Sequence, residues 1–249
     1  MHKYGLKGPD KTDHRDFIFS TSRQLKLPAK FSLKSKCIPI YDQGNLNDCV
    51  INAGLGVSEF NDFNDGDGIY VELSRLMLYY LTRVEDGDVP ENNGTYIRTM
   101  IKVFAEHGTC KESLWPNVES KFTIKPTKEC YVEALNHAIT SYHRILALFD
   151  MKACLFSGRP FILGIPIYES FESCKVAESG KIPMPKATED LQGYHAVYSC
   201  GYDDDLKVVE CANSWGNKWG NKGFFTLPYR YLEKFVIPEG AGDCWTIIK

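Results

Sequence analysis

Cys49 stands out among nine cysteines because it comes directly before a dense apolar run. The stretch DQGNLNDCVINAG places it after a Gln-Gly turn, and the residues from Val50 to Phe60 are apolar enough for a buried helix. Asp48 is of a residue type that often caps a helix N-terminus. The unpaired N–H groups and the positive dipole end of such a helix stabilise a thiolate. The sequence therefore favours a reactive nucleophile at Cys49 over one more buried thiol.

A nucleophilic cysteine needs a base, and the base needs a group that orients it. Of the six histidines, His195 differs from the rest because it opens an apolar strand, HAVYSCGY, directly after a Gly-Tyr turn. The next predicted strand, KVVECANSW, carries Asn213, whose side-chain amide can accept the imidazole N–H. Cys, His and Asn in this order predict a nucleophile, a base and an orienting residue.

The elements that must position these residues change in character near residue 140. Apolar residues at a helical period predict helices over 73–83, 95–108 and 128–139, and short β-like segments predict strands over 160–168, 195–202, 207–215 and 223–227. Gly54 and Gly56 weaken the helix after Cys49, so we expect neighbours to pack very close to it. Residues 1–36 are polar, contain Pro9 and Pro28, and predict an extended arm.

Composition excludes several classes of function. The formal net charge is -3 and the charges are spread along the chain, so binding to nucleic acid is disfavoured. No run approaches the ~20 apolar residues of a membrane helix, and the polar start lacks a signal-peptide core, which predicts a cytoplasmic protein. There is no CxxC pair, so we expect neither a metal nor another cofactor. The remaining cysteines are expected to be free, mostly buried thiols: Cys37, Cys110, Cys130, Cys154, Cys174, Cys200, Cys211 and Cys244.

Three motifs in the chain resemble those of papain-like cysteine peptidases. In DQGNLNDC a glutamine precedes the cysteine by six residues, GYHAVYSCGY resembles the histidine segment, and ANSWGNKWGNKGFF resembles the Asn-Ser-Trp-Gly segment. The motifs follow the family's order, and the resemblance runs over about residues 37–235. Leu46 and Asn52-Ala53 are typical of a branch without a signal peptide that is found in bacteria and large viruses. A viral member could be packaged in its virion.

The resemblance implies roles for the matching residues. Cys49 would be the nucleophile and His195 the general base and then the general acid, while Asn213 would orient the imidazole. Gln43, with the backbone N–H of Cys49, would bind the oxyanion. Trp215 would shield the His–Asn hydrogen bond from water.

The resemblance also implies substrate-binding positions. Asn93 and Gly94 occupy the place where the family pairs with the substrate backbone as an added strand. The backbone of Tyr194 would face the residues around the scissile bond.

The implied fold is α+β and two-lobed. A helical left lobe over residues 37–140 would face an antiparallel β-barrel-like right lobe over residues 141–249, with the active-site cleft between them. Residues 1–36 would be an arm or short pro-segment lying over the cleft. The implied activity is hydrolysis of polypeptide substrates through a thioester acyl-enzyme, with the protein's own arm as an inhibitor and without a cofactor.

Two other functions are compatible with the same motifs. A binding protein that keeps the fold without catalysis is suggested by Asn47-Asp48, where the family usually has Gly-Ser, and by Tyr194 before the histidine. An ionised Asp48 would repel a thiolate at the next residue. An acyl transferase or isopeptidase would use the same triad, and the sequence contains no feature that distinguishes it.

Overall fold

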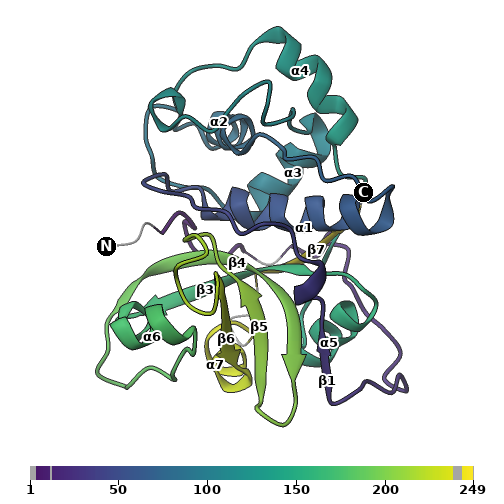
Figure 1. Ribbon diagram of the computed structural model, residues 1–249, viewed down its shortest axis with the longest axis vertical. Coiled ribbons are helices and arrows are strands. Elements are labelled where there is room, and N and C mark those ends of the chain that lie inside the picture. Colours follow the sequence, from purple (N-terminus) through teal and green to yellow (C-terminus); the bar gives the residue numbers. More distant parts are fainter. Residues whose placement is uncertain (1–3, 12, 238–242, 249) are drawn as a thin grey trace.

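The structure is a computed structural model that describes residues 4–11, 13–237 and 243–248. The helices of the first half of the chain gather at one end of the molecule, and the sheet lies at the other end together with three further helices of the described residues (Figure 1). The helices are α1 (Cys49–Asp65), α2 (Arg75–Asp86), α3 (Ile97–His107), α4 (Lys128–Ala134), α5 (Leu148–Phe156), α6 (Cys174–Ser179) and α7 (Tyr229–Phe235). The strands are β1 (Lys30–Ser32), β2 (Ser141–Arg144), β3 (Phe161–Tyr168), β4 (Leu191–Asp203), β5 (Val208–Ala212), β6 (Phe224–Pro228) and β7 (Cys244–Ile248).

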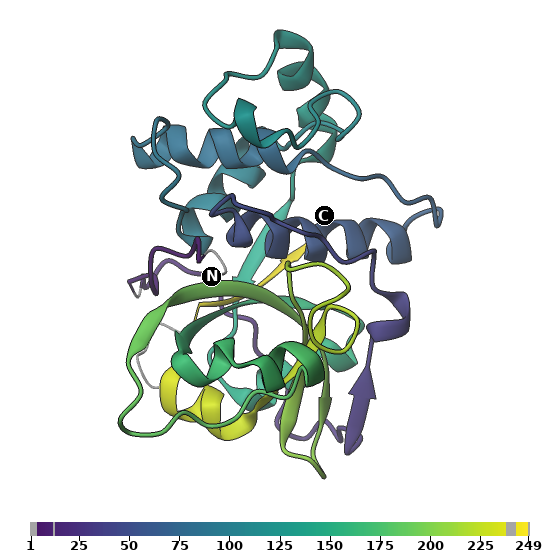
Figure 2. The same ribbon diagram turned by 60° about the vertical axis from the view of Figure 1, so that its left-hand side comes forward.

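Helix α1 is the central element and lies between the other helices of the upper lobe and the sheet (Figures 1 and 2). Its two glycines explain how it can pack on both sides. A Cβ atom at Gly54 would lie 2.4 Å from Cε of Met100 in α3, and one at Gly56 would lie 2.6 Å from the ring of Tyr198 in β4. The close neighbours expected from these glycines are therefore confirmed.

Some ends of the predicted helices follow local capping chemistry, and the start of α1 does not. Ser74 caps α2 by accepting a hydrogen bond from the backbone N–H of Met77, and Gly108 ends α3 with a φ of 67°. Asp48 occupies the N-cap position of α1, but its side chain makes no capping hydrogen bond. The Asp48 carboxylate instead accepts from Nδ2 of Asn52, at 2.8 Å. The prediction that Asp48 caps the helix through its side chain was wrong.

The strands form one antiparallel sheet. In the described residues its order is β2-β7-β3-β4-β5-β6, and β1 pairs with β4 beside this path. The end strands β2 and β6 do not pair with each other within this part of the chain, so the fold is α+β with an open sheet, and the expected barrel-like closure is not formed. Isolated bridges cover these two outer strands instead, from Ile18 to Arg144 in β2 and from Lys181 to Thr226 in β6.

The N-terminal arm contacts three parts of the molecule one after another. Residues 4–10 pass between the helices and the sheet, as the darkest purple segment in Figure 2 shows. Phe17 and Phe19 then exchange backbone hydrogen bonds with Arg144 of β2, at 2.7 and 2.8 Å. The arm ends in β1, which adds a strand to β4. The arm is thus partly an integral strand of the sheet.

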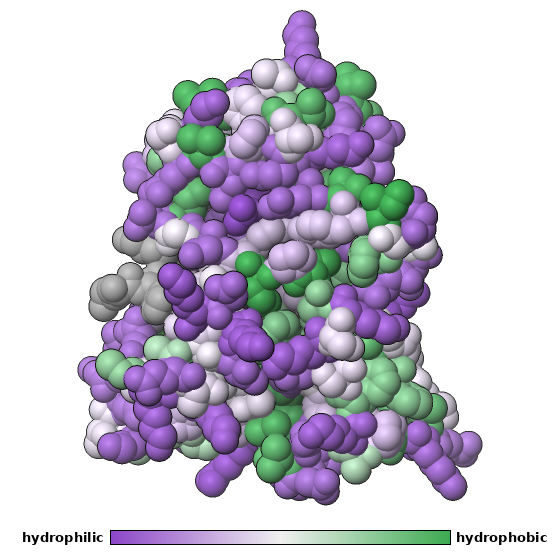
Figure 3. Space-filling view, in the orientation of Figure 1, coloured by the Kyte–Doolittle hydropathy of each residue, from purple (hydrophilic) through white to green (hydrophobic). Residues whose placement is uncertain are grey.

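The outer surface is mainly polar. Figure 3 shows a mostly hydrophilic face on which apolar side chains form small separate patches. None of the described helices combines the length and the apolar character needed to cross a membrane. All nine cysteines are free, and seven of them are buried, while Cys37 is half-buried and Cys174 is exposed.

Candidate active site

Cys49 is the first residue of α1 and is completely buried at the junction between the lobes. Its Sγ atom accepts a hydrogen bond from the backbone N–H of Ala196 in β4, at 3.4 Å. A second N–H comes from Gly5 of the arm, with the nitrogen 3.3 Å from Sγ. The candidate nucleophile is therefore enclosed by a helix N-terminus, a strand of the opposite lobe and the arm.

His195 directly precedes Ala196, the β4 residue that contacts Sγ, and its ring meets Tyr4 of the arm, the neighbour of Gly5. Its Nε2 atom lies 2.8 Å from Oδ1 of Asn213, which also accepts the backbone N–H of Ser214 at 2.8 Å. An oxygen held in this way accepts from Nε2–H, which fixes the tautomer with Nδ1 as the proton-accepting ring atom. The predicted base and orienting residue are thus brought together.

Trp215 covers the His195–Asn213 pair. Its ring stacks on the imidazole with 4.8 Å between centroids and 26° between planes. Tyr4 of the arm approaches both rings, at 6.0 Å from His195 and 6.2 Å from Trp215. The hydrogen bond is therefore shielded from water, as the sequence comparison implied for Trp215.

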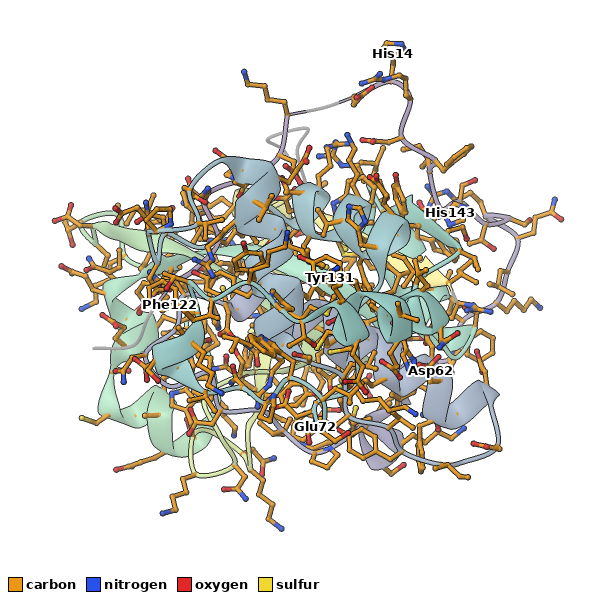
Figure 4. All side chains as sticks on the ribbon, turned by 90° about the horizontal axis from the view of Figure 1, so that it is seen from above. His14, Asp62, Glu72, Phe122, Tyr131 and His143 are labelled. Carbon is orange, nitrogen blue, oxygen red and sulfur yellow. The ribbon has the colours of Figure 1, made fainter. Side chains whose placement is uncertain are left out.

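Other histidines lie away from this gap. Figure 4 places His14 at the tip of a loop of the arm that projects from the body, where its side chain is 95% exposed. His143 lies on β2, where its ring meets Phe17 of the arm at 6.1 Å between centroids. Neither histidine contributes to the site around Cys49.

Gln43 is held rigidly beside α1. Its Oε1 accepts from Oγ of Ser214 at 2.7 Å, and its Nε2 donates to the carbonyl oxygen of Leu46 at 2.8 Å. A buried amide fixed in this way is the kind of preorganised donor that stabilises an oxyanion.

Burial dominates the electrostatics around the thiol. It raises the pKa of Cys49 to about 12, although the N–H groups of Ala196 and Gly5 act in the opposite direction, and the charge of Asp48 adds to the rise. Burial likewise raises the pKa of Asp48 to about 7, against the charge of Arg75 and the hydrogen bond from Asn52. With the arm in place, the cysteine is therefore held as a neutral thiol.

The arm pairs with a different residue from those that the sequence suggested. Asn93 is exposed, and the N–H of Gly94 donates to the hydroxyl oxygen of Tyr79 at 3.2 Å. The strand-like contact is made by Thr95, whose N–H donates to the carbonyl oxygen of Gly5 at 2.9 Å and whose carbonyl oxygen accepts from Lys7 N–H at 3.2 Å. Sequence reasoning missed Thr95, because the glycine pattern directed attention to the two preceding residues.

On the opposite wall, the backbone of Tyr194 faces the arm. Its carbonyl oxygen accepts from the N–H of Leu6, at 3.4 Å. The Leu6 side chain is 5% exposed and leaves a residual cavity of about 10 Å³ against β3, Tyr194 and Asp243. The arm thus fills a side-chain pocket as well as pairing with both walls.

Gly5 is a close-fitting point of the arm. A Cβ atom at this position would lie 1.8 Å from the carbonyl oxygen of Asn47, a backbone atom two residues before Cys49. A Cβ at Gly94 would lie 1.9 Å from the carbonyl oxygen of Gly5. The arm at Gly5 and one wall of the cleft at Gly94 therefore both require glycine for the arm to occupy this path.

Asn47 does not extend into the cleft. Its Nδ2 donates to the backbone oxygen of Asn92, and its own N–H donates to Oδ1 of Asn92 at 2.9 Å. In the described part of the chain, no group of three or more His, Cys, Asp or Glu side chains could hold a metal ion. The described site consists of a thiol, an imidazole and amides.

Comparison with known proteins identifies this arrangement. A family model described as papain family cysteine protease matches residues 27–237, which is most of the chain. The chain belongs to the papain family of cysteine proteases. It is therefore a cysteine peptidase with a papain-like fold.

Relatives within the family include viral and protozoan proteins. An uncharacterised peptidase C1-like protein of Acanthamoeba polyphaga mimivirus is 34% identical over 241 residues, covering 93% of this chain and 74% of the relative. A cathepsin B-like protein of Giardia intestinalis, CP2, is 26% identical over 228 residues, covering 86% of this chain and 73% of the relative. The second likeness is weaker, but it extends over a similar share of each chain.

The fold match is strong with one solved structure. Xylellain, a cysteine protease from Xylella fastidiosa, superposes with a TM-score of 0.90 at 33% identity, covering 99% of this chain and 96% of that one. The superposition therefore includes the N-terminal arm of this chain as well as the two lobes. Of the two residues that depart from the usual family motif, Asp48 is buried and Asn47 is half-buried.

Proposed function

We propose that this peptidase cleaves polypeptides internally through a thioester acyl-enzyme on Cys49. The Sγ atom attacks the carbonyl carbon of the scissile peptide bond while Nδ1 of His195 takes the thiol proton. The resulting oxyanion accepts hydrogen bonds from the backbone N–H of Cys49 and from Gln43. The observation that carries this proposal is the placement of His195, held by Asn213 at 2.8 Å on a strand whose next residue contacts Sγ.

Collapse of the tetrahedral intermediate breaks the C–N bond. His195 returns its proton to the leaving nitrogen, and the acyl group remains on Sγ as a thioester. A water molecule that gives a proton to His195 then attacks the thioester carbon, which releases the carboxylic acid product and restores the thiol. Asn213 and Trp215 keep the ring in one orientation through both proton transfers.

We further propose that the arm inhibits this activity and makes the full chain a zymogen. Gly5 presents an N–H to Sγ, so no carbonyl carbon of the arm lies at the point of attack. The arm also runs in the wrong direction for cleavage. His195 protonates the leaving amine, so the C-terminal part of a substrate belongs on the His195 and Trp215 side, where the arm instead places Tyr4, which precedes Gly5.

The test uses a substitution that the cleft cannot accommodate. Gly5→Ala in the full chain places a Cβ against the Asn47 oxygen, so we expect this variant to cleave unfolded casein much faster than the unsubstituted chain. Lys26→Ala, at an exposed position of the same arm, is the control and should leave the rate unchanged. Equal rates for Gly5→Ala and the unsubstituted chain would contradict inhibition by the arm.

The catalytic part of the proposal needs a separate test. Cys49→Ala in the Gly5→Ala background should abolish cleavage, and mass mapping of the Gly5→Ala chain that keeps Cys49 should locate a thioester or alkylated adduct on Cys49. A Gly5→Ala variant that stays folded and cleaves nothing would contradict the proposed hydrolysis. It would favour the binding protein suggested by the buried carboxyl of Asp48. Product analysis with an added amine acceptor distinguishes hydrolysis from acyl transfer.

A further inference from the structure

Two carboxylates at the end of α2 converge on one ammonium group. Nζ of Lys7 in the arm lies 3.0 Å from Oδ2 of Asp86 and 2.7 Å from Oδ2 of Asp88. The three side chains are largely shielded from solvent, with exposures of 19% for Lys7, 8% for Asp86 and 19% for Asp88. Nζ also lies 5.7 Å from the ring centre of Tyr96. The lysine therefore occupies a shaped cation site.

This cation site is joined directly to the substrate path. Asp86 accepts a hydrogen bond from Oγ1 of Thr95 at 2.8 Å, and Thr95 is the residue whose backbone pairs with the arm. The N–H of Lys7 itself donates to the Thr95 carbonyl oxygen. A peptide paired along Thr95 can therefore direct a side chain toward Asp86 and Asp88.

The site is left with excess negative charge when the arm departs. Two carboxylates that share one ammonium repel each other once that ammonium is removed. The guanidinium of Arg83 is close enough to interact with Asp88, but its N–H groups donate to the backbone oxygens of Tyr79, Val89 and Phe122. Arg83 thus offsets part of the negative charge of Asp86 and Asp88, but it does not occupy the position of the Lys7 ammonium. Another cation can bind there.

The arm also indicates which substrate residue reaches this position. Gly5 lies at Sγ, Leu6 fills the next pocket, and Lys7 follows beside Thr95. A substrate runs in the opposite direction along the same wall, with the residue before the scissile bond at the Gly5 position. Its second residue before the cut then lies near the Leu6 pocket, and its third lies near the Lys7 site.

We propose that Asp86 and Asp88 are specificity-determining residues that select a Lys or Arg side chain three positions before the scissile bond. This inference rests on the peptidase function proposed above. The arm and the substrate then compete for the same two carboxylates. The arm binds in the cleft through Lys7, which is a side chain of the type that the enzyme selects in its substrate.

The experiment compares fluorogenic peptides that differ in one residue only. Each has leucine at the second position before the scissile bond, and Lys, Arg, Gln or Glu at the third position before it. In the Gly5→Ala full chain, we expect kcat/KM for the Lys and Arg peptides to exceed that for the Gln peptide by about tenfold, since charge-assisted hydrogen bonds are roughly twice as strong as neutral ones. Adding Asp86→Asn and Asp88→Asn should reduce this ratio to within about twofold. Glu85→Gln, a neighbouring exposed acid of α2, is the matched control and should keep the ratio.

In the chain with its native Gly5, the combination of Asp86→Asn and Asp88→Asn should raise the rate of cleavage. Loss of the Lys7 anchor weakens the arm, so cleavage of the Gln peptide should rise there. General destabilisation would lower the rates in both backgrounds, and melting temperatures check for it. A ratio near one in Gly5→Ala, or a ratio that survives the double substitution, would overturn the specificity site.

Peptide binding separates this inference from the peptidase function. Gly5→Ala combined with Cys49→Ala cannot form the acyl-enzyme, and its affinity for labelled Lys and Gln peptides is measured by fluorescence anisotropy. Tighter binding of the Lys peptide, lost on Asp86→Asn and Asp88→Asn, would support the site even if no variant cleaves peptides. Equal affinities would overturn it whether or not cleavage occurs.

Discussion

Two stretches of the N-terminal arm contact the body of the protein in different ways. In the cleft, residues 4–7 are held by two backbone hydrogen bonds to Thr95 and one to Tyr194, by the Lys7 ion pairs and by a glycine that fits without a Cβ. In the sheet, β1 pairs with β4 over three consecutive residues, and the following Leu33 is 4% exposed and donates to the oxygen of Cys200 at 2.7 Å.

Residues 4–7 occupy the cleft and can be removed, whereas β1 is a structural strand of the sheet. The cleft contacts depend on charge and on close fit, and both walls of the cleft remain intact without them. The β1 contacts complete a sheet and cover an apolar residue, so their loss exposes the core. The arm is therefore a two-part element in which only the first part can act as a plug.

The largest effect is expected from removing only the plug. A chain that starts at Gly8 loses Leu6 burial, worth about 2 kcal/mol, and two partly shielded ion pairs, each worth about 0.5 kcal/mol. Together these amount to about 3 kcal/mol, so peptidase activity should rise by roughly a hundredfold. The rate is measured on a short peptide with active-site titration, and an unchanged rate would show that the cleft segment does not obstruct substrate.

Removal of β1 as well should lower the stability of the protein. A chain that starts at Lys34 lacks β1 and Leu33 and should lose about 2–4 kcal/mol of unfolding free energy, since a buried leucine and a strand pairing are removed together. Thermal and urea unfolding measure the loss, with the chain that starts at Gly8 as the control. Equal stability of the two truncated chains would contradict the distinction between residues 4–7, which act as a plug, and β1, which acts as a structural strand.

A cluster of charges lies at the point where the arm leaves the cleft. The N–H of Asp10 donates to both carboxyl oxygens of Asp243, at 3.1 and 3.0 Å, and Asp10 accepts from the backbone N–H of Arg98 at 2.8 Å. The guanidiniums of Arg98 and Arg144 both bind Asp16. These three carboxyls and two guanidiniums are electrically balanced only if one carboxyl keeps a proton. Burial, together with the charge of Asp10, raises the pKa of Asp243 to about 8.

Closure of the plug should therefore depend on pH. A carboxyl whose pKa is raised in the closed state favours closure below its ordinary pKa near 4, and that contribution is lost as pH rises toward about 8. The activity ratio of the chain starting at Gly8 to the full chain should fall by about tenfold between pH 5 and pH 8. Asp243→Asn should make the ratio nearly independent of pH, and a pH-dependent ratio in this variant would assign the titration to another group.

The sequence predicted those features that depend on local pattern. Helices α1, α2 and α3 and strands β3, β4, β5 and β6 follow apolar periods and turn residues. Cys49, His195 and Asn213 could be singled out from the sequence because each lies in a motif of its own, and their catalytic roles stay a prediction. These features need no knowledge of distant contacts.

The features that were missed depend on contacts between distant residues. Strand β2 is a polar four-residue segment, and β7 is a short run, so neither shows a period of its own. Nothing near Gly5 predicts a contact with Cys49, and nothing near Asp10 predicts one with Asp243, 233 residues away. The pairing at Thr95 depends on the Tyr79 hydroxyl that occupies the N–H of Gly94, which no local pattern indicates.

The smallest effect is expected at Asp48, inside the site that the plug covers. Its pKa of about 7 means that its carboxyl is neutral below pH 7 and charged above it, and the charge raises the pKa of Cys49. In the Gly5→Ala background, Asp48→Asn should leave the alkylation rate of Cys49 unchanged near pH 5 and increase it about threefold at pH 8, since only the charged form repels a thiolate. The substituted side chain retains an oxygen for the hydrogen bond from Asn52, so helix α1 keeps its first turn.

Peptide mapping after timed exposure to iodoacetamide measures the rate at Cys49 separately from the other eight thiols. Superimposable pH profiles for the two chains would mean that Asp48 stays neutral throughout, and the departure from the usual family motif would then have no effect on the nucleophile. A rate that diverges only above pH 7 would instead place a titrating group one residue from Sγ. In that case, the plug and Asp48 would restrain the same thiol in different pH ranges: the plug most strongly in acid, and the Asp48 charge only above neutrality.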